Sequence, residues 1–127
     1  MALIQTRPKR SISGGRYKAY RKKRIYETGS SPTSTKIGKT QTKVKKMKGG
    51  KSKISLLHAE SVNLKVKNKN LKAKIITVKE SPANRHFIRR NILTKGTIIE
   101  TDKGLAKITN RPGQEGTVNA ILIKESI

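Results

Sequence analysis

The stretch SVNLKVKNKNLKAKIITV, residues 61–78, alternates apolar and polar side chains on both sides of a short polar segment. The apolar positions are Val62, Leu64 and Val66 before that segment, and Leu71, Ala73 and Ile75 after it. Because successive side chains of a strand point to opposite faces, each half would bury one face and leave a lysine-rich face in water. The stretch therefore predicts a β-hairpin that turns at the Asn-Lys-Asn of residues 68–70.

Further short strands are expected around this hairpin. Residues 97–109, TIIETDKGLAKIT, predict a second hairpin, with Gly104 in the left-handed position of a bulged loop. A turn at residues 110–116, NRPGQEG, leads into a last strand at residues 117–123. Residues 54–58 are consistent with one more strand.

The segment between the two hairpins, residues 81–96, starts with Ser-Pro, which is typical of a helix N-terminus. We expect one or two helical turns over residues 83–90 and a strand near residues 92–94. Together these elements predict a mainly β protein: a small antiparallel β-barrel of five to six short strands, preceded by a long, basic, irregular N-terminal extension.

Charge divides the 127-residue chain near residue 53. Residues 1–53 carry 17 Lys/Arg and one acid, whereas residues 54–127 carry 14 Lys/Arg and six acids. The first part has few apolar residues and no helical or strand period, so it cannot offset the cost of ordering its backbone. The prediction is a basic extension over residues 1–53 that is disordered when free, and a small barrel domain over residues 54–127.

The net charge of +24 implies a polyanionic partner, because so much positive charge repels itself in a compact protein. Within the extension, RYKAYRKKRIYETG at residues 16–29 interleaves all three tyrosines of the chain with Arg and Lys. Such rings can stack on unpaired bases while the cations neutralise phosphates. A basic run can also be a solvated face or a localisation signal, but a bias over 53 residues favours nucleic-acid binding.

Other classes of function find little support in the sequence. The chain has no cysteine, and its two histidines, His58 and His86, have no cluster of acids around them, so no metal site or cofactor is expected. Gly38-Lys39-Thr40 and Gly50-Lys51-Ser52 lack the first glycine of a phosphate loop. No nucleophile lies beside an evident base, so we expect neither enzyme activity nor a small-molecule substrate. The longest apolar run has four residues, too few for a membrane helix.

Residues 10–29, RSISGGRYKAYRKKRIYETG, resemble the N-terminal motif of the small-subunit ribosomal protein family S8e of archaea and eukaryotes. That pattern runs Arg, two residues, Thr-Gly-Gly, five residues, a basic cluster, then an acid, any residue and Gly. The matching positions are Arg10, Gly14, Gly15, Arg21, Lys22, Lys23, Glu27 and Gly29. Ser13 replaces the usual Thr, Ile25 replaces a usual Lys, and Ser30-Ser31 stand where Arg-Pro is expected.

The segments TKIG (35–38), NRHFIRRN (84–91) and RPGQEGTVNA (111–120) are also similar to this family, and the short length is similar to its archaeal members. The resemblance implies a β-barrel with a basic extension, bound to small-subunit rRNA in the cytoplasmic ribosome beside other ribosomal proteins. It implies a structural role without catalysis. We expect no membrane partner and no stable homo-oligomer.

Charge clustering and the resemblance together select the candidate RNA-binding residues. They are Arg10, Gly14, Gly15, Arg16, Tyr17, Lys18, Tyr20, Arg21, Lys22, Lys23, Arg24, Lys36, Lys39, Lys45, Lys46, Lys48, Arg85, His86, Arg89, Arg90 and Arg111. For His86, an exposed helix face and contact with a phosphate or base are equally consistent with the sequence. The alternative functions are a DNA-binding architectural protein of the chromatin type and an RNA-modifying enzyme with a recognition arm.

Overall fold

The computed structural model describes residues 3–4, 7–67 and 69–125. The chain divides into two compact units, Met1–Pro32 and Thr33–Ile127, here called the N-terminal and C-terminal units. This division falls earlier in the chain than the change in charge near residue 53. Residues 33–53 therefore belong structurally with the barrel, although their composition resembles that of the extension.

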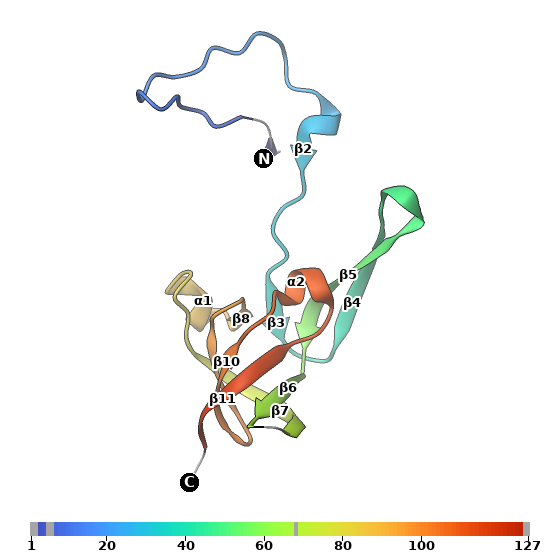
Figure 1. Ribbon diagram of the computed structural model, residues 1–127, viewed down its shortest axis with the longest axis vertical. Coiled ribbons are helices and arrows are strands. Elements are labelled where there is room, and N and C mark those ends of the chain that lie inside the picture. Colours follow the sequence, from blue (N-terminus) through green and yellow to red (C-terminus); the bar gives the residue numbers. More distant parts are fainter. Residues whose placement is uncertain (1–2, 5–6, 68, 126–127) are drawn as a thin grey trace. The chain divides into compact units, whose positions relative to one another are not determined.

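A closed five-stranded barrel is the main element of the C-terminal unit (Figure 1), which confirms the predicted fold class. The order around the barrel is β10-β11-β6-β7-β9. Its strands are β6 (Ser61–Val66), β7 (Lys69–Glu80), β9 (Ile98–Thr101), β10 (Gly104–Ile108) and β11 (Asn119–Glu125). The two predicted hairpins are the pairs β6–β7 and β9–β10.

One pair in the barrel, β6 with β11, is parallel, with Leu64 opposite Ala120. The other neighbouring pairs are antiparallel. A closed ring with an odd number of strands cannot alternate direction throughout, so five strands require at least one parallel pair. The expectation of a purely antiparallel barrel was wrong in this one pair.

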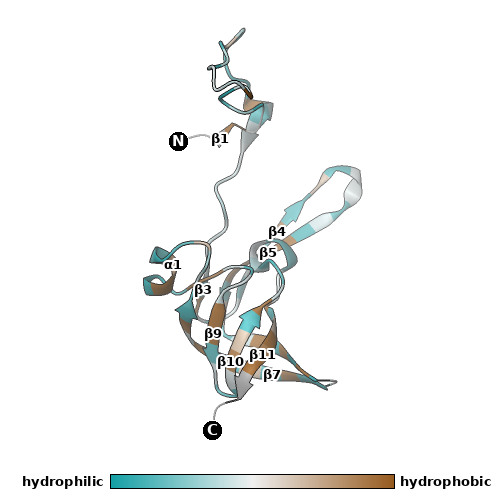
Figure 2. Cartoon of the chain, turned by 60° about the vertical axis from the view of Figure 1, so that its left-hand side comes forward, coloured by the Kyte–Doolittle hydropathy of each residue, from teal (hydrophilic) through white to brown (hydrophobic). Residues whose placement is uncertain are grey.

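The core follows the alternation that the sequence predicted, except at Leu71, which is exposed. Val62 and Leu64 of β6 and Ala73 and Ile75 of β7 are buried, while the lysines between them are exposed. The other buried apolar residues of the core are Leu56, Ala59, Val78, Leu93, Ile99, Ala106, Ile108, Val118 and Ala120. Figure 2 shows the resulting apolar colour along the barrel strands.

A second sheet has the order β4-β5-β3-β8. Its strands are β3 (Thr35–Ile37), β4 (Gln41–Lys46), β5 (Ser52–Ala59) and β8 (Ile92–Leu93). Strands β4 and β5 form a long hairpin that projects from the barrel (Figure 1), with the 3₁₀ turn η2 (Lys48–Gly50) at its tip. The predicted strand at residues 54–58 is thus confirmed but longer.

Two short helices complete the C-terminal unit. Helix α1 (His86–Arg89) is one turn, shorter than the helix expected over residues 83–90. Helix α2 (Pro112–Glu115) lies where only a turn was expected, and it ends at Gly116 with φ +73°. Residues 110–119 are held together by buried Asn110, whose amide donates to the Thr117 carbonyl at 2.8 Å and whose oxygen accepts from the Asn119 N–H at 2.9 Å.

The N-terminal unit has little regular structure. Strands β1 (Leu3–Ile4) and β2 (Thr28–Gly29) pair, and the 3₁₀ turn η1 (Ile25–Glu27) precedes β2. No residue described in this unit is buried. The disorder expected of this unit when the protein is free of partners remains a prediction.

Candidate nucleic-acid interface

The N-terminal unit contains eleven of the predicted RNA-binding residues. Residues 9–17 form a small loop in which the Ser11 N–H donates to the Gly15 carbonyl at 2.8 Å and Arg10 Nη1 donates to the Gly14 carbonyl at 2.9 Å. Gly14 has a φ of +83°, which glycine adopts without strain. The Gly14-Gly15 pair therefore makes a tight turn that leaves Arg16 exposed beyond it.

Tyrosine and arginine side chains stack on one another in this unit. The Arg7 guanidinium lies 4.4 Å from the centre of the Tyr17 ring, and its Nη2 donates to the Lys18 carbonyl at 2.7 Å. Tyr20 remains 80% exposed and Tyr26 is also exposed. Exposed rings among cations have the chemistry needed to stack on unpaired bases beside a phosphate backbone.

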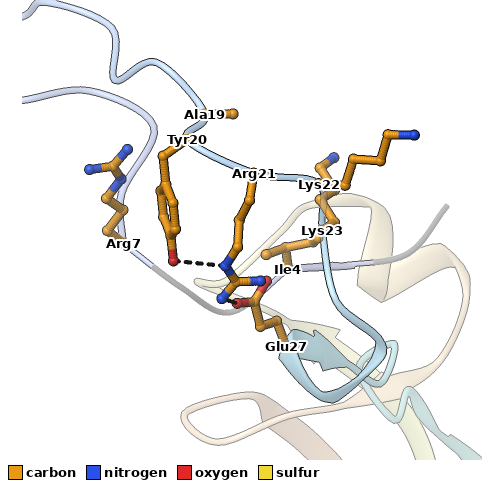
Figure 3. Close-up of a pocket in the computed structure, with 8 residues that line it drawn as sticks. All are labelled: Ile4, Arg7, Ala19, Tyr20, Arg21, Lys22, Lys23 and Glu27. Atoms are coloured by element: carbon orange, nitrogen blue, oxygen red, sulfur yellow. Dashed lines mark hydrogen bonds and ion pairs between the residues drawn. The ribbon is translucent and has the colours of Figure 1, made fainter.

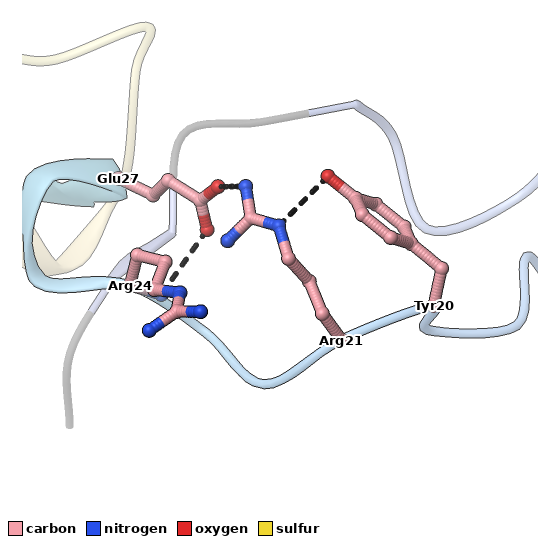
Figure 4. Close-up of polar contacts among 4 residues, drawn as sticks. All are labelled: Tyr20, Arg21, Arg24 and Glu27. Atoms are coloured by element: carbon pink, nitrogen blue, oxygen red, sulfur yellow. Dashed lines mark hydrogen bonds and ion pairs between the residues drawn. The ribbon is translucent and has the colours of Figure 1, made fainter.

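Arg21 is the centre of a set of polar contacts (Figure 4). Its Nε donates to the Tyr20 hydroxyl at 2.9 Å, and its Nη2 donates to Glu27 Oε1. Glu27 Oε2 accepts from the backbone N–H of Arg24 at 3.3 Å. That backbone hydrogen bond, followed by the Arg21 guanidinium, lowers the pKa of Glu27. The Tyr20 hydroxyl and then the Glu27 carboxylate raise the pKa of Arg21.

A pocket of about 360 Å³ lies beside these contacts. Figure 3 shows its lining, which includes Arg7, Lys22 and Lys23 as well as the Arg21–Glu27 pair. With several cations and one carboxylate that is already paired, the pocket suits an anionic group such as a phosphate.

The β4–β5 hairpin gathers a second group of lysines. Residues 41–53 contain six lysines and no acid, and every residue of β4 is exposed. Lys45 lies opposite Lys53 in the register, and Lys43 lies opposite Ser55. Alternation places Lys43, Lys45 and Lys53 on one face, here called the lysine face of the hairpin.

The remaining predicted residues lie on other parts of the C-terminal unit. Lys36 lies on β3 and Lys39 follows that strand, while Arg111 precedes α2. Around α1 lie Arg85, His86, Arg89 and Arg90. The His86 side chain is exposed, and its backbone N–H donates to Asn84 Oδ1 at 2.9 Å. The exposure of His86 fits either of the two interpretations drawn from the sequence.

The outer face of the β6–β7 hairpin is rich in lysine, as the alternation predicted. Lys65, Lys72 and Lys74 are exposed there, with Lys72 opposite Asn63 in the register. Lys74 lies 3.6 Å from Glu60, and both side chains are largely exposed. An exposed pair of this kind contributes little to stability, so it leaves the lysine available to a stronger anion.

Among the residues that the structure describes, no three His, Asp or Glu side chains come together in a way that could hold a metal ion. Within the same residues, no helix is long and apolar enough to cross a membrane.

Comparison with known proteins identifies the family. The family described as ribosomal protein S8e matches residues 4–123. The chain belongs to the ribosomal protein S8e family. It is 45% identical to the small ribosomal subunit protein eS8 of Sulfolobus acidocaldarius, over 98% of this chain and all of that protein. It is 44% identical to the eS8 protein of Methanocorpusculum labreanum, over 96% of this chain and 99% of that protein.

This member of the S8e family has candidate contact residues that the sequence analysis did not select. Lys43, Lys51 and Lys53 lie on the β4–β5 hairpin beside predicted Lys45 and Lys46. Lysines alternate with other residues on both sides of Gly49-Gly50, and this pattern could have indicated a hairpin. The segment has few large apolar residues, however, so the sequence favoured a disordered extension there instead. Arg7 was also not predicted, and neither was the pairing of Glu27, because the contacts of these residues with Tyr17 and Arg21 are seen only in the structure.

Proposed function

We propose that the chain is a structural constituent of the small ribosomal subunit and that it binds and stabilises folded small-subunit rRNA in the cytoplasm. The observation that carries this proposal is the N-terminal unit, which has nine Lys/Arg, one acid and no buried residue among those described. Such a segment gains little from its own packing, so its stabilisation comes from a polyanion. Membership of the S8e family points to rRNA as that polyanion.

In the proposed mechanism, the N-terminal unit enters crevices between RNA helices. Arg and Lys side chains neutralise phosphates that approach closely there, while Tyr17 and Tyr20 contact bases or sugars. The tight turn at Gly14-Gly15 allows close approach of the backbone to RNA.

The barrel acts as the rigid base from which the basic segments extend. The lysine face of the hairpin and the outer face of β6–β7 each present cations on a regular strand, where spacing is fixed by the backbone. Contacts of this kind set the position of a protein on RNA rather than read its sequence. The proposed role is therefore architectural and requires no catalytic group.

Sedimentation tests this function directly. The native protein is expected to co-sediment with small ribosomal subunits in moderate salt, and RNase rather than DNase is expected to release it. In a purified system, binding to small-subunit rRNA is expected to exceed binding to duplex DNA of matched length. Release by DNase, or equal affinity for the two nucleic acids, would support the chromatin-type alternative instead.

A further inference from the structure

We propose that Arg21 and Glu27 form a clip that shapes residues 21–27 into a phosphate-binding loop, with Arg21 acting as a positioning residue. This inference rests on the proposed binding of rRNA. It assigns contact with phosphates to Lys22, Lys23 and Arg24, and it gives Glu27, the only acid of the first 53 residues, a positive role in binding an anion.

The clip is closed by contacts at both oxygens of Glu27. One oxygen accepts from Arg21 Nη2, and the other accepts from the Arg24 backbone N–H at 3.3 Å. The Glu27 N–H in turn donates to the Arg24 carbonyl at 3.1 Å. These bonds bring together residues six positions apart, and the loop is followed directly by the β1–β2 ladder at Thr28.

The guanidinium of Arg21 is already occupied by groups of the same unit. The rings of Tyr20 and Tyr26 have their centres 5.1 and 5.9 Å from Arg21 Cζ, within the range of cation–π attraction. Arg21 Nε donates to the Tyr20 hydroxyl at 2.9 Å. Its Nη1 is enclosed and has no hydrogen-bond partner among the described residues, so a phosphate could reach that atom only if the clip opened.

Exposure separates the roles of neighbouring residues. The side chains of Arg21 and Glu27 are 30% and 16% exposed, whereas Lys22, Lys23 and Arg24 are all exposed. Figure 3 shows the amines of Lys22 and Lys23 turned away from Glu27. Of the four consecutive cations at residues 21–24, the clip therefore pairs Arg21 with Glu27 and leaves the other three available to phosphates.

The variant Glu27→Gln tests the clip because two explanations predict opposite signs. If charge alone governed binding, removal of an acid would strengthen the affinity for rRNA. If Glu27 holds the loop, the amide loses the ionic hydrogen bond to Arg21 and the loop frays. We expect affinity about threefold to tenfold weaker, the size of one typical net hydrogen bond, because the pair is partly exposed to water.

A second variant, Arg21→Lys, keeps the charge but loses the planar fork that reaches Tyr20 and Glu27 together. We expect a loss similar to that of Glu27→Gln. The double variant is expected to lose no more than either single variant, because two residues that act through one contact are not additive. Losses that add fully in the double variant would overturn the clip.

The matched control is Glu60→Gln, which removes an exposed acid of the C-terminal unit that lies 3.6 Å from Lys74. We expect its affinity for rRNA to equal or slightly exceed that of the wild type. The thermal unfolding of the clip variants should match the wild type, because the clip lies outside the barrel unit. That of Glu60→Gln should also match, because its ion pair is largely exposed. Any measured loss then reports binding rather than unfolding of the barrel.

The outcomes distinguish the clip from the function on which it rests. Wild-type protein that binds rRNA no better than matched duplex DNA would overturn the proposed function. Wild-type protein that binds rRNA, with Glu27→Gln binding equally or more tightly, would leave that function in place and overturn the clip. Weaker binding by both Glu27→Gln and Arg21→Lys, with Glu60→Gln unaffected, is the result that supports it.

Discussion

Lys45 of β4 lies directly opposite Lys53 of β5 in the ladder of the projecting hairpin. Like charges at opposed positions of an antiparallel pair destabilise the pairing. Of the ion pairs found within the described residues, none includes a residue of this hairpin. The free protein thus holds an unfavourable arrangement that a phosphate between the two amines would relieve.

Charge reversal at Lys53 is expected to change stability and binding in opposite directions. In Lys53→Glu, the new carboxylate attracts the opposed Lys45 amine instead of repelling it, so hairpin stability should rise by about 0.2–1 kcal/mol. Affinity for rRNA should fall, because the lysine face loses a cation and gains an anion. Chemical denaturation and a filter-binding titration measure the two effects on one preparation.

Lys103→Glu is the control for this variant, since Lys103 is exposed in the turn between β9 and β10, far along the chain from the hairpin. A smaller loss of affinity there would show that position matters beyond net charge. Equal losses in the two variants would mean that the lysine face has no special role.

Gly116 packs closely against Ile54 of the β4–β5 hairpin, and Gly116→Ala is expected to destabilise the C-terminal unit. The residue has a φ of +73°, and a Cβ built on it would lie 2.6 Å from Ile54 Cγ2. The left-handed backbone alone costs an alanine about 1–2 kcal/mol, and the overlap adds to that cost. Thermal unfolding should show a lower melting temperature for the variant.

The double variant Gly116→Ala/Ile54→Ala separates these two causes. Ile54→Ala removes the overlap with Cγ2 but leaves the backbone strain and the 3.0 Å approach to the Ile54 Cβ. Gly116→Ala should therefore cost less stability in the Ile54→Ala background than in the wild type. Complete additivity of the two single effects would show that the overlap has no energetic weight.

The barrel could be predicted from sequence because its strands follow a simple period. Val62, Leu64, Ala73 and Ile75 alternate with polar residues, mostly lysines, and burial followed that alternation. The parallel β6–β11 pair could not be predicted, because it depends on which strands pair when the sheet closes into a barrel and not on any local sequence pattern. Helix α2 was also missed, since a four-residue helix leaves no period to detect.

The candidate interface was predictable in composition but not in geometry. Runs of Arg and Lys indicated the candidate nucleic-acid-binding segments, whereas the contact of Arg21 with Glu27 joins residues whose pairing no repeat or spacing rule specifies. Strand β3 was not predicted for another reason. Buried Thr35, whose hydroxyl donates to the Leu56 carbonyl at 2.7 Å, places β3 through a polar contact rather than through apolar periodicity.

Amide hydrogen exchange on the free protein tests where the ordered part of the chain begins. Residues 7–20 and 30–32 are expected to exchange freely, because none of them is buried, whereas the Arg24 and Glu27 amides held by the clip should exchange more slowly. Protection is expected to start at β3, where Thr35 is fully buried, and to be weaker in exposed β4. Slow exchange across residues 7–20 without RNA would contradict the predicted disorder, and free exchange up to residue 53 outside the clip would favour the boundary drawn from charge.

Salt dependence measures how many cations reach phosphates. If about eight phosphates are neutralised, the logarithm of the affinity for rRNA should fall against the logarithm of salt concentration with a slope near roughly −6 to −7. The slope should become shallower by about one unit when Lys22 or Lys23 is replaced by Ala, because each loses one phosphate contact. A wild-type slope of about −2 would mean that most of the basic side chains face water.

Titration of Glu27 tests the clip without RNA. Its pKa is lowered below the ordinary value of 4.5, mainly by the Arg24 backbone N–H and further by Arg21. A carboxyl group with a lowered pKa in the ordered loop stabilises that loop above its ordinary pKa, and the stabilisation is lost as the pH falls through the lowered value. The clip should therefore be intact at neutral pH and open only in acid below pH 4.5.

NMR titration of the Glu27 side-chain carbon is expected to give a midpoint below 4.5 in the wild type. In Arg21→Lys the midpoint should rise only part of the way to 4.5, because the Arg24 N–H still donates to the carboxylate. A wild-type midpoint at or above 4.5 would show that neither contact holds the carboxylate in solution.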